Sequence, residues 1–538
     1  MNDVMITPDS DIYLLKVPFE MDNENQLTFT NVTAQYNYFM GLSNKLELEN
    51  ATYQRKDGML RWAGSFDDIV GYNYCMYQNT HFSNKWFFAY IEDLKFENPS
   101  MTSIKLKTDV FQTWQFDIVY KNMFVEREHV NDDTVGLHTV PETLETGDYI
   151  INGSSIVTGI TYWNDIAYIV GVSKVQLLQN GSWQKSQAGL YFGTMSGLTY
   201  YGFLDNATER GDLISMLNYY DTEGQGESIE CIFIVPKVFV NAHRITNPLT
   251  APYDQYRMEK VNTVLSTTFS LTRNSGIDGY TPRNNKLYVF PYQYLNLDNH
   301  GGASYNYHYE DFKGINALTG TFDFEVIGTL TVGCSIYILP SGYRSTTNKV
   351  EYGLPYQKFP VCNWVSDVYT NWLTQTAVNI PIGIAQMGVG AGAMLLSNGS
   401  IGGSYLTGGM QKILDQLYQK HQHSFTPNET KGSINSGDVI TVDYRFAPSF
   451  NQMTIKQEYA KIIDNYFTLY GYKINKVKIP NITGRTNWNY VKTINCNIVG
   501  DIPQKDIQEL KGIFDNGVTL WHNPSTFLDY TQSNTIVT

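Results

Sequence analysis

The chain has 538 residues, of which 42% are hydrophobic, 14% aromatic and only 17% charged, and its formal net charge is −14. The aromatic content excludes intrinsic disorder, and the acidic balance disfavours a protein that grips nucleic acid through phosphate contacts. A length several times that of a typical domain of ~100–200 residues indicates three to five domains.

Short strands rich in Tyr, Phe, Val, Ile and Thr, separated by Asn, Asp and Gly turns, account for most of the sequence. No repeat of fixed period is visible, which disfavours a β-helix or a propeller. The clearest strand candidates in chain order are 85–91, 168–176, 231–239, 286–294 and 322–339.

Helical periodicity is confined to a few segments. The candidate helices are 212–220, 411–421, 454–470 and 503–516. The clearest is 454–470, with apolar residues at three-, four- and seven-residue spacing, Thr454 as the expected N-cap and Gly471 as the stop. In the last helix, Pro503 suits the first helical position and Gly517 follows the end. The predicted fold class is therefore mainly β with minor α, in several β-barrel or β-sandwich domains.

The cysteines offer no framework for disulfides or zinc. Cys75, Cys231, Cys334, Cys362 and Cys496 lie far apart and form no CxxC pair, so we expect reduced core thiols. The first residues lack the basic and apolar regions of a secretory signal, and we expect synthesis in a cytoplasm.

One segment is conspicuous because it carries no charge. Between Asp367 and Lys412, 44 consecutive positions lack a charged residue, and residues 377–410 within them include nine glycines. A core element is disfavoured by glycine, which packs poorly and has a large folding entropy cost. A transmembrane helix is disfavoured because the best run, 382–396, is shorter than the ~20 residues needed to span a bilayer. A core element and a membrane inserter that is sheltered within an assembly and later released both stay open.

The large apolar side chains of this segment can each gain about 1.5–3 kcal/mol on full burial. The candidate membrane-active residues are Ala377, Val378, Ile380, Pro381, Ile382, Ile384, Met387, Val389, Met394, Leu395, Leu396, Ile401, Tyr405, Leu406 and Met410. The hinge and turn candidates are Gly383, Gly388, Gly390, Gly392, Ser397, Asn398, Gly399, Gly402, Gly403, Gly408 and Gly409. The polar turn at Ser397–Ser400 indicates a hairpin of two limbs, whose backbone would need neighbouring chains in lipid to satisfy its hydrogen bonds.

No catalytic constellation is evident. GxSxG, HExxH, a P-loop and GxGxxG followed by a helix are all missing. Acidic pairs such as Asp67-Asp68 and Asp132-Asp133 suit a glycosidase only if the fold brings carboxyl groups together. His421 and His423 lack an identifiable third ligand for a metal. We therefore predict a protein that is not an enzyme and that has no metal or cofactor.

Several unusual stretches occur in order along the chain and resemble one family. They include TDVFQTWQFD (108–117), YTPRNNKLYVFPYQYLNLDNHGG (280–302), FPVCNWVSDVYTNWLTQ (359–375), IIDNYFTLYGYKINKV (462–477) and GRTNWNYVKT (484–493). The family is that of the distal tail knob, or tail tube, proteins of phi29-like short-tailed bacteriophages of the picovirus type, which infect Gram-positive bacteria.

The resemblance implies a homohexameric tube of β-domains at the distal tip of the virion tail, below the lower collar or connector protein. It implies five parts, with approximate boundaries: a β tube domain (1–145), a second β domain with a short helix (146–285), a third β domain (286–365), a hydrophobic loop with flanking helices (366–430) and an α+β domain (431–538).

The resemblance also implies a role for the uncharged segment. The loops would plug the lumen, leave it on infection, and form a pore in the host cytoplasmic membrane for DNA passage. The implied partners are copies of the chain itself, the lower collar protein, membrane lipids, and viral DNA that passes without sequence-specific binding. An acidic lumen would repel phosphate and let DNA slide. The alternatives are a tail-tip receptor-binding adhesin and a wall-polysaccharide hydrolase.

Overall fold

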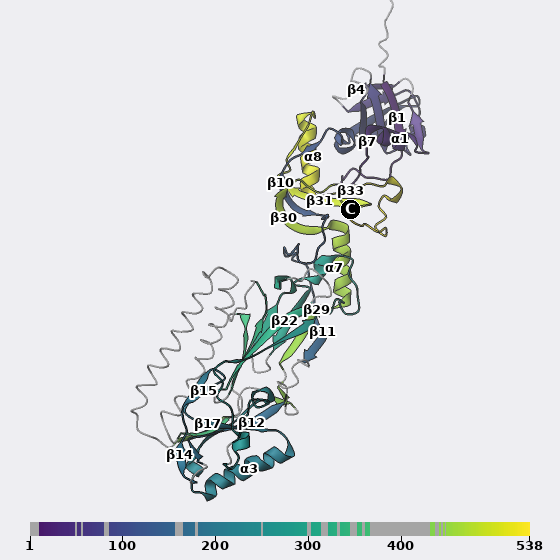
Figure 1. Ribbon diagram of the computed structural model, residues 1–538. Coiled ribbons are helices and arrows are strands. Elements are labelled where there is room, and N and C mark those ends of the chain that lie inside the picture. The colour runs from purple at the N-terminus through teal and green to yellow at the C-terminus, as the bar shows by residue number, and fades with distance from the viewer. Residues whose placement is uncertain are drawn as a thin grey trace, which may run out of the picture. The chain divides into compact units, whose positions relative to one another are not determined.

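The computed structural model describes most of the chain (Figure 1). The described residues are 10–48, 51–54, 58–79, 85–156, 165–177, 181–248, 251–298, 303–313, 321–330, 334–344, 352–357, 361–365, 431–435, 441–442, 445–446 and 448–537. Strands dominate these ranges and helices are few, so the predicted mainly-β fold class is confirmed.

The chain forms two compact units. Unit 1 comprises Met1–Glu145, Arg283–Lys286 and Lys461–Thr538, and unit 2 comprises Thr146–Pro282 and Leu287–Ala460. Unit 1 therefore joins the two ends of the chain, together with four residues from its middle.

Two sheets form unit 1. The first has the order β3-β1-β6-β7-β8-β5-β4. Its strands are β1 (Ser10–Leu15), β3 (Lys45–Glu47), β4 (Ala51–Gln54), β5 (Met59–Trp62), β6 (Tyr74–Asn79), β7 (Trp86–Asn98) and β8 (Met101–Thr108). The second has the order β2-β33-β31-β10-β30, and the short pair β9–β32 accompanies it. Its strands are β2 (Asn25–Leu27), β10 (Met123–Glu128), β30 (Tyr472–Lys478), β31 (Trp488–Ile494) and β33 (Val518–Trp521), with β9 (Val119–Tyr120) and β32 (Ile498–Val499).

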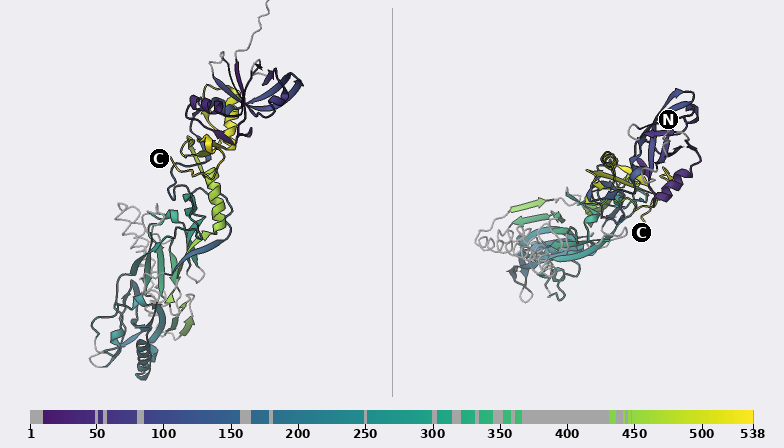
Figure 2. Two further views of the ribbon diagram at one scale, coloured as in Figure 1. Left: turned by 90° about the vertical axis from the view of Figure 1, so that its right-hand side faces the viewer. Right: turned by 90° about the horizontal axis from the view of Figure 1, so that it is seen from above.

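An aromatic core and three short helices hold these sheets together. The helices are α1 (Val32–Met40), α2 (Val110–Trp114) and α8 (Gln504–Asn516). Phe39 of α1 packs among Tyr74, Phe88, Trp488 and Trp521, so both sheets supply side chains to one core. The helix α8 contacts α2 on one side and β31 and β32 on another, and it is the yellow helix in the left view of Figure 2.

Unit 2 is built from three larger sheets. Their orders are β11-β29-β20-β21, β19-β22-β23-β24 and β17-β12-β18-β25-β26. The strands are β11 (Tyr149–Ile156), β12 (Ile166–Val172), β17 (Thr199–Leu204), β18 (Ile229–Pro236), β19 (Leu265–Thr272), β20 (Gln293–Asp298), β21 (Ser304–Tyr307), β22 (Thr321–Thr329), β23 (Ser335–Pro340), β24 (Leu354–Gln357), β25 (Val361–Val365), β26 (Lys431–Asn435) and β29 (Ser449–Ile455).

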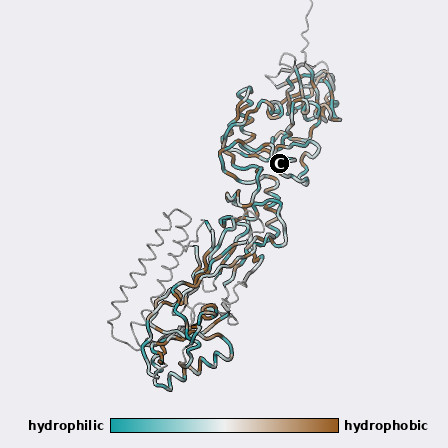
Figure 3. The backbone as a smooth tube through the Cα atoms, in the orientation of Figure 1, coloured by the Kyte–Doolittle hydropathy of each residue, from teal (hydrophilic) through white to brown (hydrophobic). Residues whose placement is uncertain are grey.

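Alternating side chains build the core of unit 2. Along β20, Leu295 and Leu297 are buried whereas Asn296 between them is partly exposed, which is the period of a strand with one face in the core. Figure 3 shows hydrophilic and hydrophobic residues intermixed along the described backbone. Phe324 of β22 meets Phe450 of β29 at 5.0 Å between ring centroids, so the first two sheets pack face to face.

Four of the five predicted strand segments are confirmed as strands. Residues 85–91 begin β7, 168–176 fall in β12 and the short β13 (Lys174–Gln176), 231–239 fall mostly in β18, and 322–339 cover β22 and most of β23. The prediction for 286–294 is wrong in its first half, because Asn285–Tyr288 form a 3-10 turn and β20 begins at Gln293.

Three helix predictions fall on described residues, and each is confirmed with shifted ends. Residues 212–220 lie within α3 (Ala207–Thr222), 503–516 match α8, and 454–470 match α7 (Gln457–Tyr470). Thr454 is not an N-cap, because it lies in β29. Its hydroxyl instead donates to Tyr292 O at 3.4 Å. Pro503 precedes α8 at the N-cap position rather than opening it. The helix predicted at 411–421 lies outside the described residues.

Buried carboxylates hold the segment Arg283–Lys286 within unit 1. Asp464, which is fully buried, accepts hydrogen bonds from the backbone N–H of Arg283 at 3.0 Å and of Asn284 at 3.1 Å. Asp133 accepts from the N–H of Asn285 at 3.0 Å. Each carboxylate thus satisfies backbone donors of a segment that forms no sheet ladder.

The fourth residue of the segment, Lys286, ends in a buried ion cluster. Glu142 is 5% exposed and pairs with both Lys286 and Arg127, which are themselves buried. Its Oε1 also accepts from the N–H of Lys473 at 2.8 Å. Burial lowers the pKa of Lys286, and Glu142 opposes that effect. The cluster fixes β10, β30 and the inserted segment to one another.

We predict that Glu142→Gln lowers the free energy of unfolding of unit 1 by about 3–5 kcal/mol, because it leaves two cations buried without a counter-charge. Chemical denaturation measures the change. The exposed pair Lys105–Glu92 provides the control, and Glu92→Gln should leave the midpoint unchanged. Equal stability of Glu142→Gln and the wild type would contradict the account.

Candidate functional site

All the residues predicted to form the membrane-active segment and its hinges, from Ala377 to Met410, lie outside the described residues. His421 and His423 lie outside them as well. The nearest described strands are β25 before the segment and β26 after it. What the structure contributes is the geometry at the base of the segment.

The two strands that flank the segment are hydrogen-bonded neighbours. In the antiparallel pair β25–β26, Val361 is opposite Asn435 and Val365 is opposite Lys431. Directly opposed residues of such a ladder have Cα atoms about 4.5–5.5 Å apart. The chain therefore leaves this sheet at Val365 and re-enters it opposite the same residue, and β25 and β26 form the stem of residues 366–430.

The stem is attached to strands that are packed on both faces. β25 pairs with β18, where Val361 is opposite Phe233. Phe233 lies in the main core of unit 2, whereas Val170 of the next strand, β12, packs with Met216 of α3 in a separate cluster. Figure 1 shows α3 beside the β12–β17 part of this sheet. The stem thus starts from a sheet whose described strands have core clusters on both faces.

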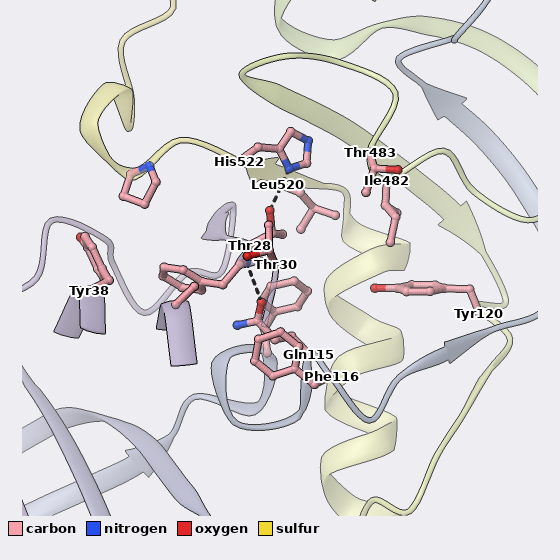
Figure 4. A pocket seen from close by; sticks show the side chains of 14 residues that line it. Thr28, Thr30, Tyr38, Gln115, Phe116, Tyr120, Ile482, Thr483, Leu520 and His522 are labelled. Carbon is pink, nitrogen blue, oxygen red and sulfur yellow. Dashed lines mark hydrogen bonds between the residues drawn. The ribbon is translucent and has the colours of Figure 1, made fainter. Parts of the chain in front are cut away.

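An apolar pocket lies in unit 1 (Figure 4). Its volume is about 430 Å³. The lining residues are Thr28, Phe29, Thr30, Ala34, Tyr38, Phe111, Gln115, Phe116, Tyr120, Ile482, Thr483, Leu520, His522 and Pro524. Half of these residues are apolar, and the side chains of Thr28, Gln115 and His522 are hydrogen-bonded within the protein.

His522 at the edge of this pocket is held in a neutral state. Its Nδ1 lies 2.8 Å from Thr28 Oγ1 and its Nε2 lies 2.9 Å from Asn489 Oδ1. The amide oxygen can only accept, so Nε2 carries a proton and donates to it, while Nδ1 and Trp521 O both lie within hydrogen-bond distance of the one hydroxyl of Thr28. Burial lowers the pKa of His522 to about 4.

A second, polar pocket of about 510 Å³ lies elsewhere in unit 1. It includes His129, whose Nδ1 accepts from Tyr490 N at 2.7 Å and whose Nε2 donates to Thr468 O at 3.0 Å. Burial, with Arg485 nearby, lowers the pKa of His129 to about 3. Its two ring nitrogens are therefore committed to the fold and are not poised for proton transfer.

The acidic pairs considered in the sequence have structural roles. Asp132 accepts from Thr134 N at 3.0 Å in a turn, while Asp133 binds Asn285 and the hydroxyl of Tyr472. Asp67 and Asp68 lie exposed in the 3-10 turn η1 (Phe66–Asp68). Neither pair has the surroundings of a glycosidase acid and base.

Within the described ranges, no group of three or more His, Cys, Asp or Glu side chains is placed to hold a metal ion. Among the same residues, no helix combines the length and the apolar character that a membrane crossing requires.

Known proteins of bacteriophage tails resemble this chain over nearly its whole length. It is 25% identical to the tail knob protein gp9 of Bacillus phage phi29, over 95% of this chain and 96% of that protein. It is 23% identical to the tail knob protein gp9 of Bacillus phage B103, over 97% of both chains. The solved structure of the bacteriophage C1 tail knob protein, gp12, has the same fold, with a TM-score of 0.67 at 16% identity over 98% of this chain and 100% of that one.

These similarities define the class as a structural protein of a bacteriophage virion tail. Residues 9–121 match the model of the caudoviral major tail protein N-terminus. Residues 254–535, more than half of the chain, match the model of the C-terminal domain of the phi29 tail knob protein gp9. The chain therefore belongs to the phi29 tail knob protein family.

Sequence reasoning located the uncharged segment but did not find its stem. The segment shows itself by the absence of charge, whereas the pairing of VCNWV with KGSIN joins residues that are far apart in sequence. The local sequence of neither strand predicts which other strand it pairs with.

A pH-dependent prediction follows from His522. Its pKa is below the unfolded value of about 6.5, so its contribution to stability is complete above pH 6.5 and is lost as the pH falls towards about 4. His522→Gln keeps a neutral donor for Asn489 and should reduce this loss by on the order of 3 kcal/mol. Denaturation curves at pH 7.5, 5.5 and 4.5 measure it. Burial raises the pKa of Asp109 to about 6, so protonation of Asp109 at low pH stabilises the fold and opposes the effect of His522. The effect of His522 is therefore read from the difference between the variant and the wild type at each pH. If the free energy of unfolding changed with pH in the same way in the variant and the wild type, the low pKa of His522 would be contradicted.

From the direct pairing of β25 with β26, we predict that residues 366–430 can be removed without loss of the fold. Replacing 366–430 by Asn-Gly closes β25 and β26 with a two-residue hairpin turn. Shortening the loop should leave unit 2 equally stable or stabilise it by up to about 3 kcal/mol through loop-closure entropy. Circular dichroism and thermal unfolding measure the outcome. A second variant that lacks only 377–410 separates the apolar part from its flanks, and unfolding of either variant would show that the segment belongs to the core.

Proposed function

We propose that this protein is a conduit for genome ejection whose apolar segments penetrate the host membrane. In this account six copies form the distal tail tube, attached to the lower collar protein. Residues 377–410 of each copy close the lumen until ejection and then enter the host cytoplasmic membrane as a pore. Membership of the tail knob family supports the structural part of this proposal.

The observation that carries the membrane role is the uncharged segment on a closed stem. Forty-four positions without charge are unfavourable on a permanently exposed surface, whereas each large apolar side chain can gain about 1.5–3 kcal/mol on full burial in lipid. Because Val365 and Lys431 are direct partners, residues 366–430 can change their surroundings while the register of the sheet stays the same. A segment that enters a membrane must be able to move without disturbing the sheet to which it is attached.

The charge of the chain suits a conduit. At −14 per chain, a ring of six copies is strongly acidic, and an acidic wall repels phosphate. DNA would then pass without adhering. The passage requires no sequence-specific contact, in agreement with the acidic composition of the chain.

Dye leakage from anionic liposomes tests the membrane role. The full chain should release the dye, and the variant with Asn-Gly in place of 366–430 should not, because only the former can transfer apolar side chains into lipid. Measurements at pH 7 and pH 5 show whether acid promotes release of the segment.

A matched pair of point variants separates the segment from general hydrophobicity. Ile382→Asp places a charge in the segment, whereas Ile214→Asp places one on α3, where Ile214 is already 59% exposed. Leakage should fall at least about tenfold for the first variant and remain unchanged for the second. Full leakage by the Asn-Gly variant, or none by the full chain, would contradict the pore.

A further inference from the structure

One sheet of unit 2 has a buried face and a face that solvent reaches. In the sheet β11-β29-β20-β21, Leu295, Leu297 and Phe450 lie in the main core. Successive residues of a strand point to opposite faces, so Tyr294 and Asn296, which alternate with the two leucines along β20, lie on the other face. Both side chains are partly exposed. We call this second face the outer face of the sheet.

Three asparagines form a row across the outer face. Asn296 of β20 is directly opposite Asn451 of β29 on one side and Asn306 of β21 on the other. Directly opposed residues point to the same face, so the three side chains lie on neighbouring strands that are about 4.8 Å apart. Asn296 Nδ2 donates to Asn306 Oδ1 at 2.8 Å. This bond leaves the amide nitrogen of Asn306 as a donor beside the carbonyl oxygen of Asn296 as an acceptor.

A row of larger side chains lies next to the asparagines on the same face. Tyr294 is opposite Met453, and Met453 is opposite Ile151 of β11, which is 56% exposed. Aromatic rings extend this row. Tyr294 meets Tyr149 at 5.3 Å and Phe290 at 6.0 Å between ring centroids, and Phe290 is 40% exposed. The outer face therefore carries an apolar and aromatic row beside a row of amides.

The four strands are almost without charge. Asp298 at the end of β20 is their single charged residue, whereas 17% of the whole chain is charged. Beside the strands, Lys456 lies 3.5 Å from Asp148 and Arg344 lies 2.6 Å from Asp311, so both of these basic side chains are paired with a carboxylate. A surface that binds nucleic acid or anionic lipid needs unpaired basic residues. A stable protein interface usually has an apolar centre, whereas amides border the apolar row here.

We propose that the outer face binds a neutral polysaccharide. A sugar ring has a face of C–H bonds, which packs on aromatic and aliphatic side chains, and a rim of hydroxyl groups, each of which both donates and accepts. The row of Ile151, Met453 and Tyr294 suits the C–H face. Neighbouring hydroxyl groups of one ring match the adjacent donor of Asn306 and acceptor of Asn296. The inference goes beyond the proposed conduit and does not depend on it.

Affinity electrophoresis of the full chain tests the proposal. The native gels contain hydroxyethyl cellulose, glycol chitin or dextran, which are soluble neutral polysaccharides with different linkages, and binding slows the migration of the protein. The wild type should be retarded by at least one of them. The double variant Asn296→Ala with Asn306→Ala removes the amide pair, and Tyr294→Ala removes the central ring. Each variant should weaken the binding about tenfold, because it removes hydrogen bonds or a stacked ring from the contact.

Matched changes at exposed positions elsewhere in the chain provide the control. Asn218→Ala on α3 and Phe96→Ala on β7, where Phe96 is 56% exposed, should leave the retardation unchanged. Circular dichroism confirms that each variant is folded, and sedimentation velocity compares its self-association with that of the wild type.

Three results would overturn the inference while leaving the proposed conduit intact. The first is the absence of retardation in all three polymers. The second is equal retardation of the wild type and both outer-face variants. The third is weaker self-association of the outer-face variants, because it would show that this face is a contact between copies of the chain.

Discussion

Unit 1 depends on buried carboxylates that replace a missing hydrogen-bond ladder. The segment Arg283–Lys286 reaches unit 1 from the middle of the sequence and has no strand neighbour there. Asp464, Asp133 and Glu142 satisfy its backbone and side-chain donors. Buried charge is tolerated only where it is paired and hydrogen-bonded, so each of these acids fixes its partners in one arrangement. The same cluster joins β10 to β30 through Arg127 and Lys473, which unites the two ends of the chain.

Unit 2 carries the long uncharged segment on the paired strands β25 and β26. The ladder β25–β26 returns the chain to the point where it left, and β18 and β12 beneath it have cores of their own. In the proposed function, the free energy for membrane entry comes from the segment's apolar side chains, while the sheet supplies a fixed attachment. In that proposal, the stem separates the stability of the body from the change of surroundings that the segment would undergo.

The spacing of apolar residues along the sequence predicted the elements that form from neighbouring residues, above all the helices. The helices α7 and α8 follow from apolar periodicity, and Gly471 ends α7 with a φ of 64°, in the left-handed region where glycine is favoured. The prediction of a strand at 286–294 is wrong at its start, where Lys286 lies in a 3-10 turn and pairs with Glu142, a residue distant in sequence. Thr454 looked like a helix cap but is bound into β29 by pairing with Gln293 of β20. The stem and the ion cluster arise from such long-range pairing, and the candidate segment itself was visible only by its lack of charge.

The central claim is that residues 377–410 enter lipid, and a fluorescent probe on the segment tests it most directly. An environment-sensitive label attached to Met394→Cys, with the same label on Ile214→Cys of α3 as reference, is measured with liposomes that carry quenchers at known depth in the bilayer. The account predicts a blue-shifted emission and quenching by the deep quencher for the label at 394, and neither for the label at 214. Identical spectra at both positions, with no quenching at 394 under conditions in which the liposomes leak, would contradict it.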